Sequence, residues 1–402
     1  TARPVLKQSI CMSTLGVIFT ALLTGLFCHY ALGMSWLEGL LTGSVVGSTD
    51  AASVFSILRS KKLNLKGGLA SLLEIESGSN DPVSYMMTII ILTIMSVSSD
   101  ISLPWMIAKQ LLFGFGIGFG VAFLSSKLLS RINFEINGMD AILVIGTALF
   151  TYGFSSWLGG NGYLSVYIVG IVLGNSKILH KTSLVHFFDG ITWLMQIAIF
   201  FVLGLLAFPS KIPSVALPAI LISVFMIIVA RPVATFLILS WFKTPVRQQL
   251  LVSWSGLRGA ASIVFAIFVM SSGVVIEHDI FHIVFFVALF SVAVQGTLLP
   301  KIADKLGLVD KEDDSLVLKT FTDYQDDVDT KLLEVPVTED DFYAGRLLRE
   351  ANIPEEVLIV MIKRHGETII PRGSTKIKVG DILVVSSESF ERFKSGQLKP
   401  PQ

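Results

Sequence analysis

The chain has 402 residues, of which 52% are hydrophobic and 15% charged, and its mean hydropathy is +0.71. This composition excludes an ordinary soluble globular protein and indicates a polytopic membrane protein. The formal net charge of zero hides an asymmetry, because residues 1–300 carry the apolar runs while residues 305–402 read as soluble. Cys11 and Cys28 lie in one apolar run and suit packing better than a disulfide or a metal site.

Apolar runs of about 20 residues predict membrane-spanning helices. Ten of them follow one another, at about 10–33, 36–58, 68–98, 104–130, 138–158, 161–176, 184–207, 213–242, 248–271 and 281–303. Basic residues gather in alternate connections, around residues 3–7, 59–66, 127–131, 177–181, 243–247 and 301–305. Because basic loops stay inside, we expect the chain start and the soluble tail to lie in the cytoplasm. No signal peptide is evident, and we expect the chain to begin inside a longer one.

The second apolar run contains GSVVGSTDAAS, with Thr49 and Asp50 at its middle. The neighbouring Gly47 and Ser48 weaken a helix. A spanning backbone breaks only where it lines protein or water, and a break here would offer main-chain carbonyls and helix ends to an ion. The pattern predicts a discontinuous helix.

The third run contains ESGSNDP, which places charges in a segment that otherwise reads as a membrane helix. Residues four apart share a helix face, so Ser77 stacks with Asp81, and Glu76 with Asn80 on the neighbouring stripe. Pro82 has no N–H, which frees a carbonyl one turn earlier and predicts a bend. These are oxygen ligands, suited to a dehydrated alkali cation or a proton.

A third polar interruption, SWSGLRGAAS, places Arg258 between Gly256 and Gly259. A buried charge is tolerated chiefly when it is paired, and the simplest partner for Arg258 is Glu76. Arg231, inside the eighth run, either pairs with an acid or snorkels, and the sequence leaves both open. A single acid in a span can belong to a structural ion pair, but three polar interruptions in three spans favour an ion pathway.

At these residues the sequence resembles an NhaP-type monovalent cation:proton antiporter, of the branch in which an Asn-Asp pair marks the ion site. The resemblance covers residues 1–305. It rests on Thr49-Asp50, on the E-S-x-x-N-D pattern that ends at Asp81, and on G-L-R-G at Gly256–Gly259. It implies an all-α polytopic fold with discontinuous crossing helices, over a domain at 1–304, and spans that precede Thr1, one of which supplies a further acid.

The resemblance also implies roles for single residues. Asp81 would bind the cation or the proton, with the Ser77 hydroxyl and the Thr49 carbonyl as further ligands of K+ or Na+. Asp50 would lie where two broken helices cross, and Asn80 would hold that crossing together.

Glu76 would pair with Arg258. Two positions depart from the family pattern: Gly78 stands where a bulkier apolar residue is common, and Glu74 is an additional acid. Glu74 would either line an entry funnel or simply be solvated.

If Asp81 holds either a proton or a cation but not both, binding of the proton displaces the cation and binding of the cation displaces the proton. With Asn80 in place of a second acid, one positive charge moves each way, so we expect electroneutral exchange. The resemblance implies that an elevator-like core moves against a homodimeric scaffold.

The tail reads as a linker at 305–330 and a β-α-β-β-β domain at 331–395, with a helix predicted in DDFYAGRLLREANI. It resembles the RCK_C (TrkA-C) lobe of potassium-system regulators, through Gly345-x-Leu347, VLIV at 357–360, IPRG at 370–373 and Gly380-Asp381. The companion Rossmann lobe is absent, so NAD binding is not expected. Such lobes dimerise and can bind a small regulator, sometimes a nucleotide. Arg364, His365 and Arg372 would serve such an anion or form a solvated turn.

The sequence thus predicts a transporter and not an enzyme, in the bacterial cytoplasmic membrane, with lipid and a second copy as partners, no cofactor and no nucleic acid. Potassium is favoured over sodium because this tail commonly accompanies potassium systems. The alternatives are a Na+/H+ antiporter with the same site, a channel or symporter bearing the same tail, and a sensor without transport. The chain offers no filter-like loop for a channel.

Overall fold

A computed structural model gives the fold of the chain. It describes residues 5–61, 63–96, 102–132, 134, 138–310, 320–321, 331–338, 341, 343–351, 353, 357–364 and 367–387. The chain divides into two compact units, Thr1–Asp310 and Lys311–Gln402, which are considered separately.

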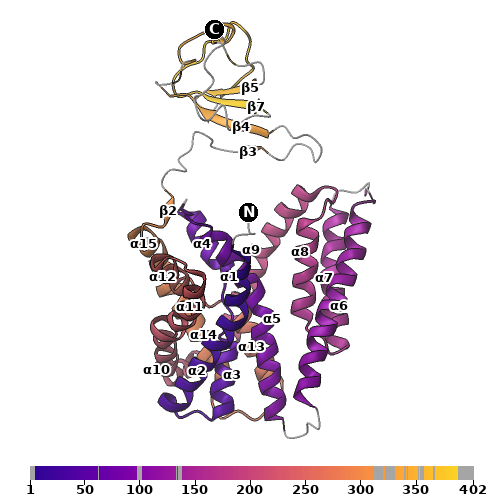
Figure 1. Cartoon of the computed structure of the whole chain (residues 1–402), viewed down its shortest axis with the longest axis vertical. Helices are drawn as coiled ribbons and strands as arrows, with labels where there is room; N and C mark the ends of the chain where they lie inside the picture. Colours follow the sequence, from indigo (N-terminus) through magenta and orange to yellow (C-terminus); the bar gives the residue numbers. More distant parts are fainter. Residues whose placement is uncertain are drawn as a thin grey trace. The chain divides into compact units, whose positions relative to one another are not determined.

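The first unit is a bundle of helices that run side by side (Figure 1). Its elements follow the predicted apolar runs in order: α1 (Leu6–Cys11), α2 (Val17–Leu32), α3 (Trp36–Val45), α4 (Ala51–Ser60), α5 (Leu69–Met95), α6 (Leu103–Leu129), α7 (Met139–Trp157), α8 (Gly162–Asn175), α9 (Lys181–Leu206), α10 (Ile212–Phe225), α11 (Arg231–Leu239), α12 (Val246–Trp254), α13 (Ala260–Ser271), α14 (Ile280–Phe290) and α15 (Thr297–Lys305). Within the described residues, six helices are long and apolar enough to cross a membrane alone. Short π-helical segments, Met12–Gly16, Met226–Ala230 and Ser291–Gly296, join three helix pairs into continuous rods.

Two spans are interrupted, as the polar stretches predicted. One break separates α3 from α4 at residues 46–50, and the other separates α12 from α13 at residues 255–259. The Asp50 amide donates to the Leu257 carbonyl at 2.8 Å, so the two breaks are hydrogen-bonded to each other. The predicted discontinuous crossing helices are therefore confirmed.

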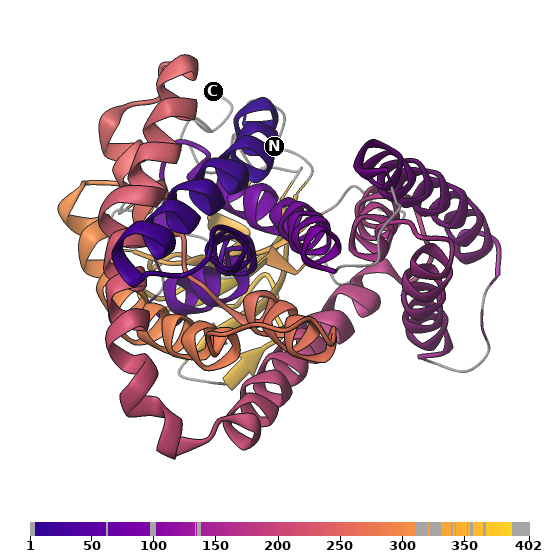
Figure 2. The same ribbon diagram turned by 90° about the horizontal axis from the view of Figure 1, so that it is seen from below.

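Three helices form a cluster beside the main bundle. Figure 2 shows α6, α7 and α8 packed on one another and set apart from the remaining helices of the unit. The polar helix α5 contacts this cluster through α8 and α6.

Close packing joins α2 to α3. A Cβ atom added at Gly25 would lie 2.9 Å from the Leu40 Cα atom. One added at Gly39 would lie 2.7 Å from the Gly25 carbonyl oxygen. One added at Gly43 would collide with the Ala21 carbonyl. Small residues let helix backbones approach this closely, and such contacts stabilise helix pairs in membranes.

The tail unit is an antiparallel sheet with strand order β3-β4-β7-β5-β6. Its strands are β3 (Thr320–Phe321), β4 (Lys331–Pro336), β5 (Val357–Arg364), β6 (Glu367–Ile369) and β7 (Ile382–Ser387). In the first unit, β1 (Asn64–Leu65) pairs with β2 (Val309–Asp310). Much of the predicted linker lies outside the described residues.

The helix predicted in DDFYAGRLLREANI is wrong for the residues that the structure describes there. They hold only a 3₁₀ turn, Leu348–Glu350. Gly345 has a positive φ of 77°, and its amide donates to the Ile377 carbonyl at 2.9 Å. Ile377 in turn donates to Arg346 at 3.0 Å, so this backbone bonds to a distant segment and not along a helix.

Gly43→Val tests the packing of α2 on α3. The added side chain has no space beside Ala21, and we expect a loss of about 1–3 kcal/mol in stability, seen as a lower unfolding midpoint of the purified protein. Gly146→Val in α7 is the matched control, because nothing lies within 4 Å of its added Cβ. Equal midpoints for the two variants would contradict the close packing.

Candidate functional site

The site is built on the break between α3 and α4. Asp50 lies directly before α4, and its carboxylate accepts from the Ser53 amide at 3.2 Å and the Ser53 hydroxyl at 2.7 Å. This is an N-cap, which satisfies an orphan donor of the half-helix. A Cβ at Gly259 would collide with the Asp50 carboxylate, so the absence of a side chain at Gly259 lets the second break approach Asp50.

The polar stripe of α5 faces the same break. The Ser77 hydroxyl donates to the Thr49 carbonyl at 2.6 Å, and the Asn80 amide donates to the Thr49 hydroxyl. Asp81, which is partly buried, accepts from the Ser48 hydroxyl. The structure thus brings Asp81, Ser77 and Asn80 together with Thr49, and Asp50 lies next to them along the chain.

Oxygen atoms dominate this cluster. The carboxylate of Asp81, the hydroxyls of Ser48 and Ser77 and the carbonyl of Thr49 are ligands that an alkali cation accepts after losing its water. Asn80 is fully buried, and within the described residues its Oδ1 atom has no hydrogen-bond partner. The sequence predicted for Ser48 only a weakening of the helix, and the contact of its hydroxyl with Asp81 was missed because no periodicity reports it.

The predicted pair of Glu76 with Arg258 is wrong. Arg231 donates to Glu76 through an Nη2–Oε1 distance of 2.6 Å, and both side chains are buried, at 2% and 1% exposure. Arg258 instead donates to the carbonyls of Gly47 and Ser48, each at 2.8 Å. The reason is that the end of α3 leaves carbonyls unpaired inside the membrane, and a guanidinium satisfies them while complementing the helix dipole.

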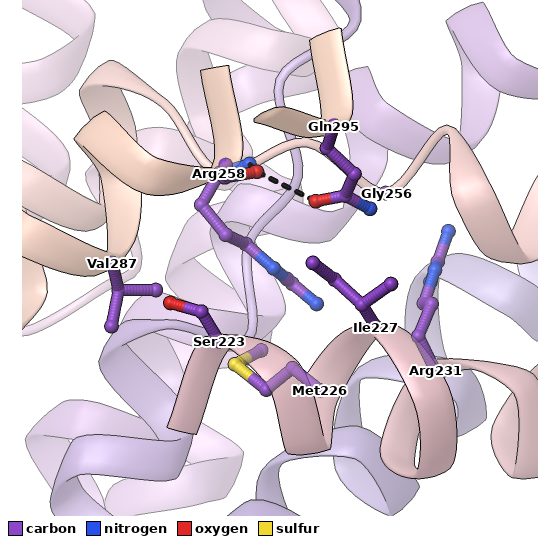
Figure 3. A pocket seen from close by; sticks show the side chains of 9 residues that line it. Ser223, Met226, Ile227, Arg231, Gly256, Arg258, Val287 and Gln295 are labelled. Carbon is purple, nitrogen blue, oxygen red and sulfur yellow. Dashed lines mark hydrogen bonds between the residues drawn. The ribbon is translucent and has the colours of Figure 1, made fainter. Parts of the chain in front are cut away.

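The two arginines line one small cavity, which Figure 3 shows with Ile227 and Gln295. Arg231 follows the π-helical segment Met226–Ala230, and its side chain lies against Gly256, where a Cβ would be 2.7 Å from its Nε atom. The cavity measures about 10 Å³, which is room for roughly one water molecule. Arg231 stands in mid-span in the sequence, and that position was the signal for its role.

Hydrogen bonds link α5 to α8. The Ser79 and Tyr167 hydroxyls are 2.7 Å apart, and the Asn161 amide donates to the Pro82 carbonyl at 2.9 Å. Gly78 faces the Tyr167 ring, where an added Cβ would lie at 3.2 Å. This boundary therefore runs beside the candidate ion ligands.

An aromatic group lies one turn beyond Asp81. The ring centroid of Tyr85 is 4.8 Å from that of Tyr163 and 5.9 Å from that of Phe265. These rings come from α5, α8 and α13, and Tyr85 follows Asp81 on the side away from the start of α5. Glu74, toward that start, is exposed.

In the tail unit, Arg364 is engaged by a carboxylate. Its guanidinium donates twice to Asp381, at 2.7 and 2.8 Å, and once to the Lys376 carbonyl at 2.8 Å. Burial raises the pKa of Asp381, but the hydrogen bonds from Arg364 and the Lys378 amide outweigh it and hold that pKa below its ordinary value. Arg372 is exposed, and His365 lies outside the described residues.

Two sequence-family models match the chain. The transmembrane sodium/hydrogen exchanger model matches residues 3–305, and the TrkA-C domain model matches residues 332–394. The chain belongs to the sodium/hydrogen exchanger family. This confirms the predicted resemblance, and it makes the chain a multi-pass monovalent cation/proton antiporter.

Similar proteins include antiporters named for either cation. The chain is 36% identical over 389 residues to the K(+)/H(+) antiporter NhaP2 of Shewanella sp. (strain ANA-3), covering 95% of this chain and 67% of that protein. It is 32% identical to the K(+)/H(+) antiporter NhaP of Alkalimonas amylolytica, with the same coverage. It is 27% identical to the Na(+)/H(+) antiporter ApNhaP of Aphanothece halophytica, over 75% of this chain and 59% of that one.

These relatives are transporters, in agreement with the expectation that the chain is not an enzyme. Among solved structures, the sodium proton antiporter MjNhaP1 of Methanocaldococcus jannaschii at pH 8 has a TM-score of 0.68 and 24% identity. The match covers 76% of this chain and 80% of that chain, and it shows a shared fold.

Replacing Arg231 tests the corrected ion pair. Arg231→Gln leaves the Glu76 carboxylate buried without a counter-charge, and we expect a loss of about 3–5 kcal/mol in stability, measured by denaturant unfolding in detergent. Adding Glu76→Gln should recover most of that loss, since the stranded charge is gone. Combining Glu76→Gln with Arg258→Gln should give no such recovery, and recovery there would favour the originally predicted pair.

The Arg364–Asp381 pair predicts that the stability of the tail unit depends on pH. The pKa of Asp381 is lower in the folded state than its ordinary value of about 4. The ion pair therefore contributes its full stabilisation at pH values above about 4, and the contribution is lost as the pH falls through the folded pKa. At pH 7, Asp381→Asn should cost about 2 kcal/mol, less than a fully buried pair, since Arg364 is partly exposed.

Hydrogen exchange of the β5 and β7 peptides in the whole chain measures this loss. The difference between variant and parent should shrink below about pH 4. Glu350→Gln, in the exposed pair with Arg349, is the control and should leave exchange unchanged. A constant difference at all pH values would show that the carboxylate charge is not responsible.

Proposed function

We propose that the chain exchanges K+ for H+ across the bacterial cytoplasmic membrane, with Asp81 holding either ion in turn. The single observation that supports this most is the position of Asp81 in the middle of α5, beside the helix break that supplies Ser48 and Thr49. A carboxylate there can take a proton or, with neighbouring oxygens, a dehydrated cation.

Competition for one carboxylate is enough for exchange. A proton on Asp81 removes the negative charge that attracts the cation, and a bound cation displaces the proton. The Ser77 hydroxyl and the Thr49 carbonyl, now 2.6 Å apart, would both turn toward the cation as ligands. Asp50 and Asn80 would keep the break in place.

The charge balance supports electroneutral exchange. Glu76 and Arg231 neutralise each other, and the position beside Asp81 holds the uncharged Asn80. The net charge of the loaded site is then the same when H+ is bound as when K+ is bound. Exchange is therefore insensitive to membrane voltage.

Potassium is the preferred cation in this proposal. The two relatives with more than 30% identity quoted above are named for K+, and the relative named for Na+ is 27% identical. The TrkA-C tail also favours K+ over Na+, because such domains accompany potassium systems. Exchange of Na+ at the same site is the rival.

Movement of the site is proposed to be elevator-like. The α6–α8 cluster, which is set apart in Figure 2, is the candidate scaffold and dimer surface, and hydrogen bonds at Ser79, Pro82 and Thr93 join α5 to it. Rigid displacement of the crossing past α8 would carry Asp81 between the two sides. The tail, in the cytoplasm, would regulate this movement through a small ligand or nucleotide at its sheet domain.

Asp81→Asn in proteoliposomes tests the proposal. Purified protein with an internal pH dye should move protons against a K+ gradient, and less strongly against Na+, at rates that an imposed voltage leaves unchanged. Asp81→Asn should reduce K+-coupled proton flux at least about 100-fold with an unfolding midpoint near that of the parent.

Glu74→Gln is the matched control, since that carboxylate is exposed and near the start of α5. It should keep most of the exchange. Proton-coupled K+ flux in Asp81→Asn would refute the assignment of the carboxylate. Equal or faster flux with Na+ would support the rival cation, and a voltage-driven flux would refute electroneutrality.

A further inference from the structure

A second group of metal-ligating side chains lies away from the crossing, where α3 begins and where α13 connects to α14. Glu38 is in the first turn of α3, and Glu277 and His278 belong to the connection. One donor atom from each of the three lies within 4.8 Å of the others. Glu38 is buried, with its side chain 4% exposed.

This group holds two carboxylates and one imidazole. Glu38 accepts from the Glu277 amide at 2.6 Å and contacts the His278 Nδ1 atom at 2.9 Å. In the described part of the chain no lysine or arginine reaches its carboxylate. The His278 imidazole faces both the buried carboxylate of Glu38 and the exposed one of Glu277, and an imidazole can meet a carboxylate either as a cation or as a co-ligand of a metal ion.

We propose that Glu38, Glu277 and His278 bind a divalent transition-metal ion of the Zn2+ class. One imidazole nitrogen and two carboxylate oxygens are a donor set that Zn2+ accepts, at about 2.0–2.2 Å from each. Tetrahedral ligands at that distance are about 3.4 Å apart. Glu277 and His278 lie in a connection and not in a helix, so the group can close by the remaining distance.

The site has a route to solvent. A cavity of about 380 Å³ is lined by Glu277, His278 and Asp279, among others. It gives a metal ion access from water and leaves a fourth position for a water ligand. The buried Glu38 would lie on the inner side of the bound ion.

A neighbouring histidine shows what a completed structural network looks like. His282 contacts Asp279 at 2.8 Å through Nδ1, and its Nε2 atom accepts from the Phe208 amide at 3.0 Å. Lys211 also pairs with Asp279 at 3.0 Å. Both imidazole nitrogens and the carboxylate charge are therefore used, whereas in the group around Glu38 a single imidazole faces two carboxylates.

The proposed ion would join the outer ends of two half-helices. α3 begins beside Glu38, and α13 ends before the connection that holds Glu277 and His278. Their inner ends meet in the two breaks at the crossing. Binding would stabilise the folded crossing by mass action, independently of whether the chain exchanges K+ or Na+.

Zinc titration of the full chain tests the site. Purified protein is stripped with a chelator and titrated with ZnCl2, and the unfolding midpoint and retained zinc are measured. We expect a saturable rise in the midpoint with about one Zn2+ per chain. His278→Ala and Glu277→Gln should each weaken zinc affinity at least about tenfold, since even the outer partners of metal ligands change affinity by that much.

His180→Ala is the matched control. His180 lies 3.8 Å from Asp140, a histidine–carboxylate pair outside the proposed site, and its removal should leave zinc binding unchanged. Glu38→Gln can fail to fold, so the two connection variants carry the test. Absence of a saturable shift, an equal shift in His278→Ala, or stabilisation by mild acid but not by zinc would each overturn the proposal.

Discussion

The helical unit depends on two breaks that satisfy each other. An unpaired carbonyl or amide in hydrocarbon costs several kcal/mol, so neither break is tolerable alone. The Asp50 amide bonds to Leu257, and Arg258 bonds to Gly47 and Ser48, so each break supplies donors or acceptors that the other lacks. The irregular backbone at Thr49, the proposed cation ligand, is satisfied because the second break lies beside it.

The buried charges then divide into two groups with different consequences. Glu76 and Arg231 form a closed pair between α5 and α11, with almost no exposure. Asp81 receives a hydroxyl hydrogen bond from Ser48 within the described residues, and no arginine is directed at it. Within the proposed mechanism this contrast matters, because a carboxylate locked to an arginine would have no free charge to offer to a proton or a cation.

Much of this could be predicted from the sequence, since the relevant signals are local. Apolar length, alternating loop charge and the glycine-rich polar stretches around Asp50 and Arg258 indicated the spans and both breaks. The partner of Glu76 could not be chosen, because helix periodicity says which residues share a face and not which helix packs against it. In the tail, the sequence favoured a helix around Gly345, but its backbone bonds to Ile377, and local periodicity does not reveal a partner so distant in the chain.

Two faces of α5 contact different neighbours, the crossing on one side and α8 on the other. One face is held by the crossing, through hydrogen bonds of Ser77 and Asn80 to Thr49, and in the proposed elevator movement this face travels together with the crossing. The adjacent face meets Tyr167 of α8, and the proposed movement would break and re-form that contact. Gly78 departs from the bulkier residue expected of the family, and the structure gives a reason: the Tyr167 ring lies where a side chain would project. A smooth glycine surface with one hydroxyl bond at Ser79 separates more easily than interlocked side chains, so this departure suits a boundary that slides.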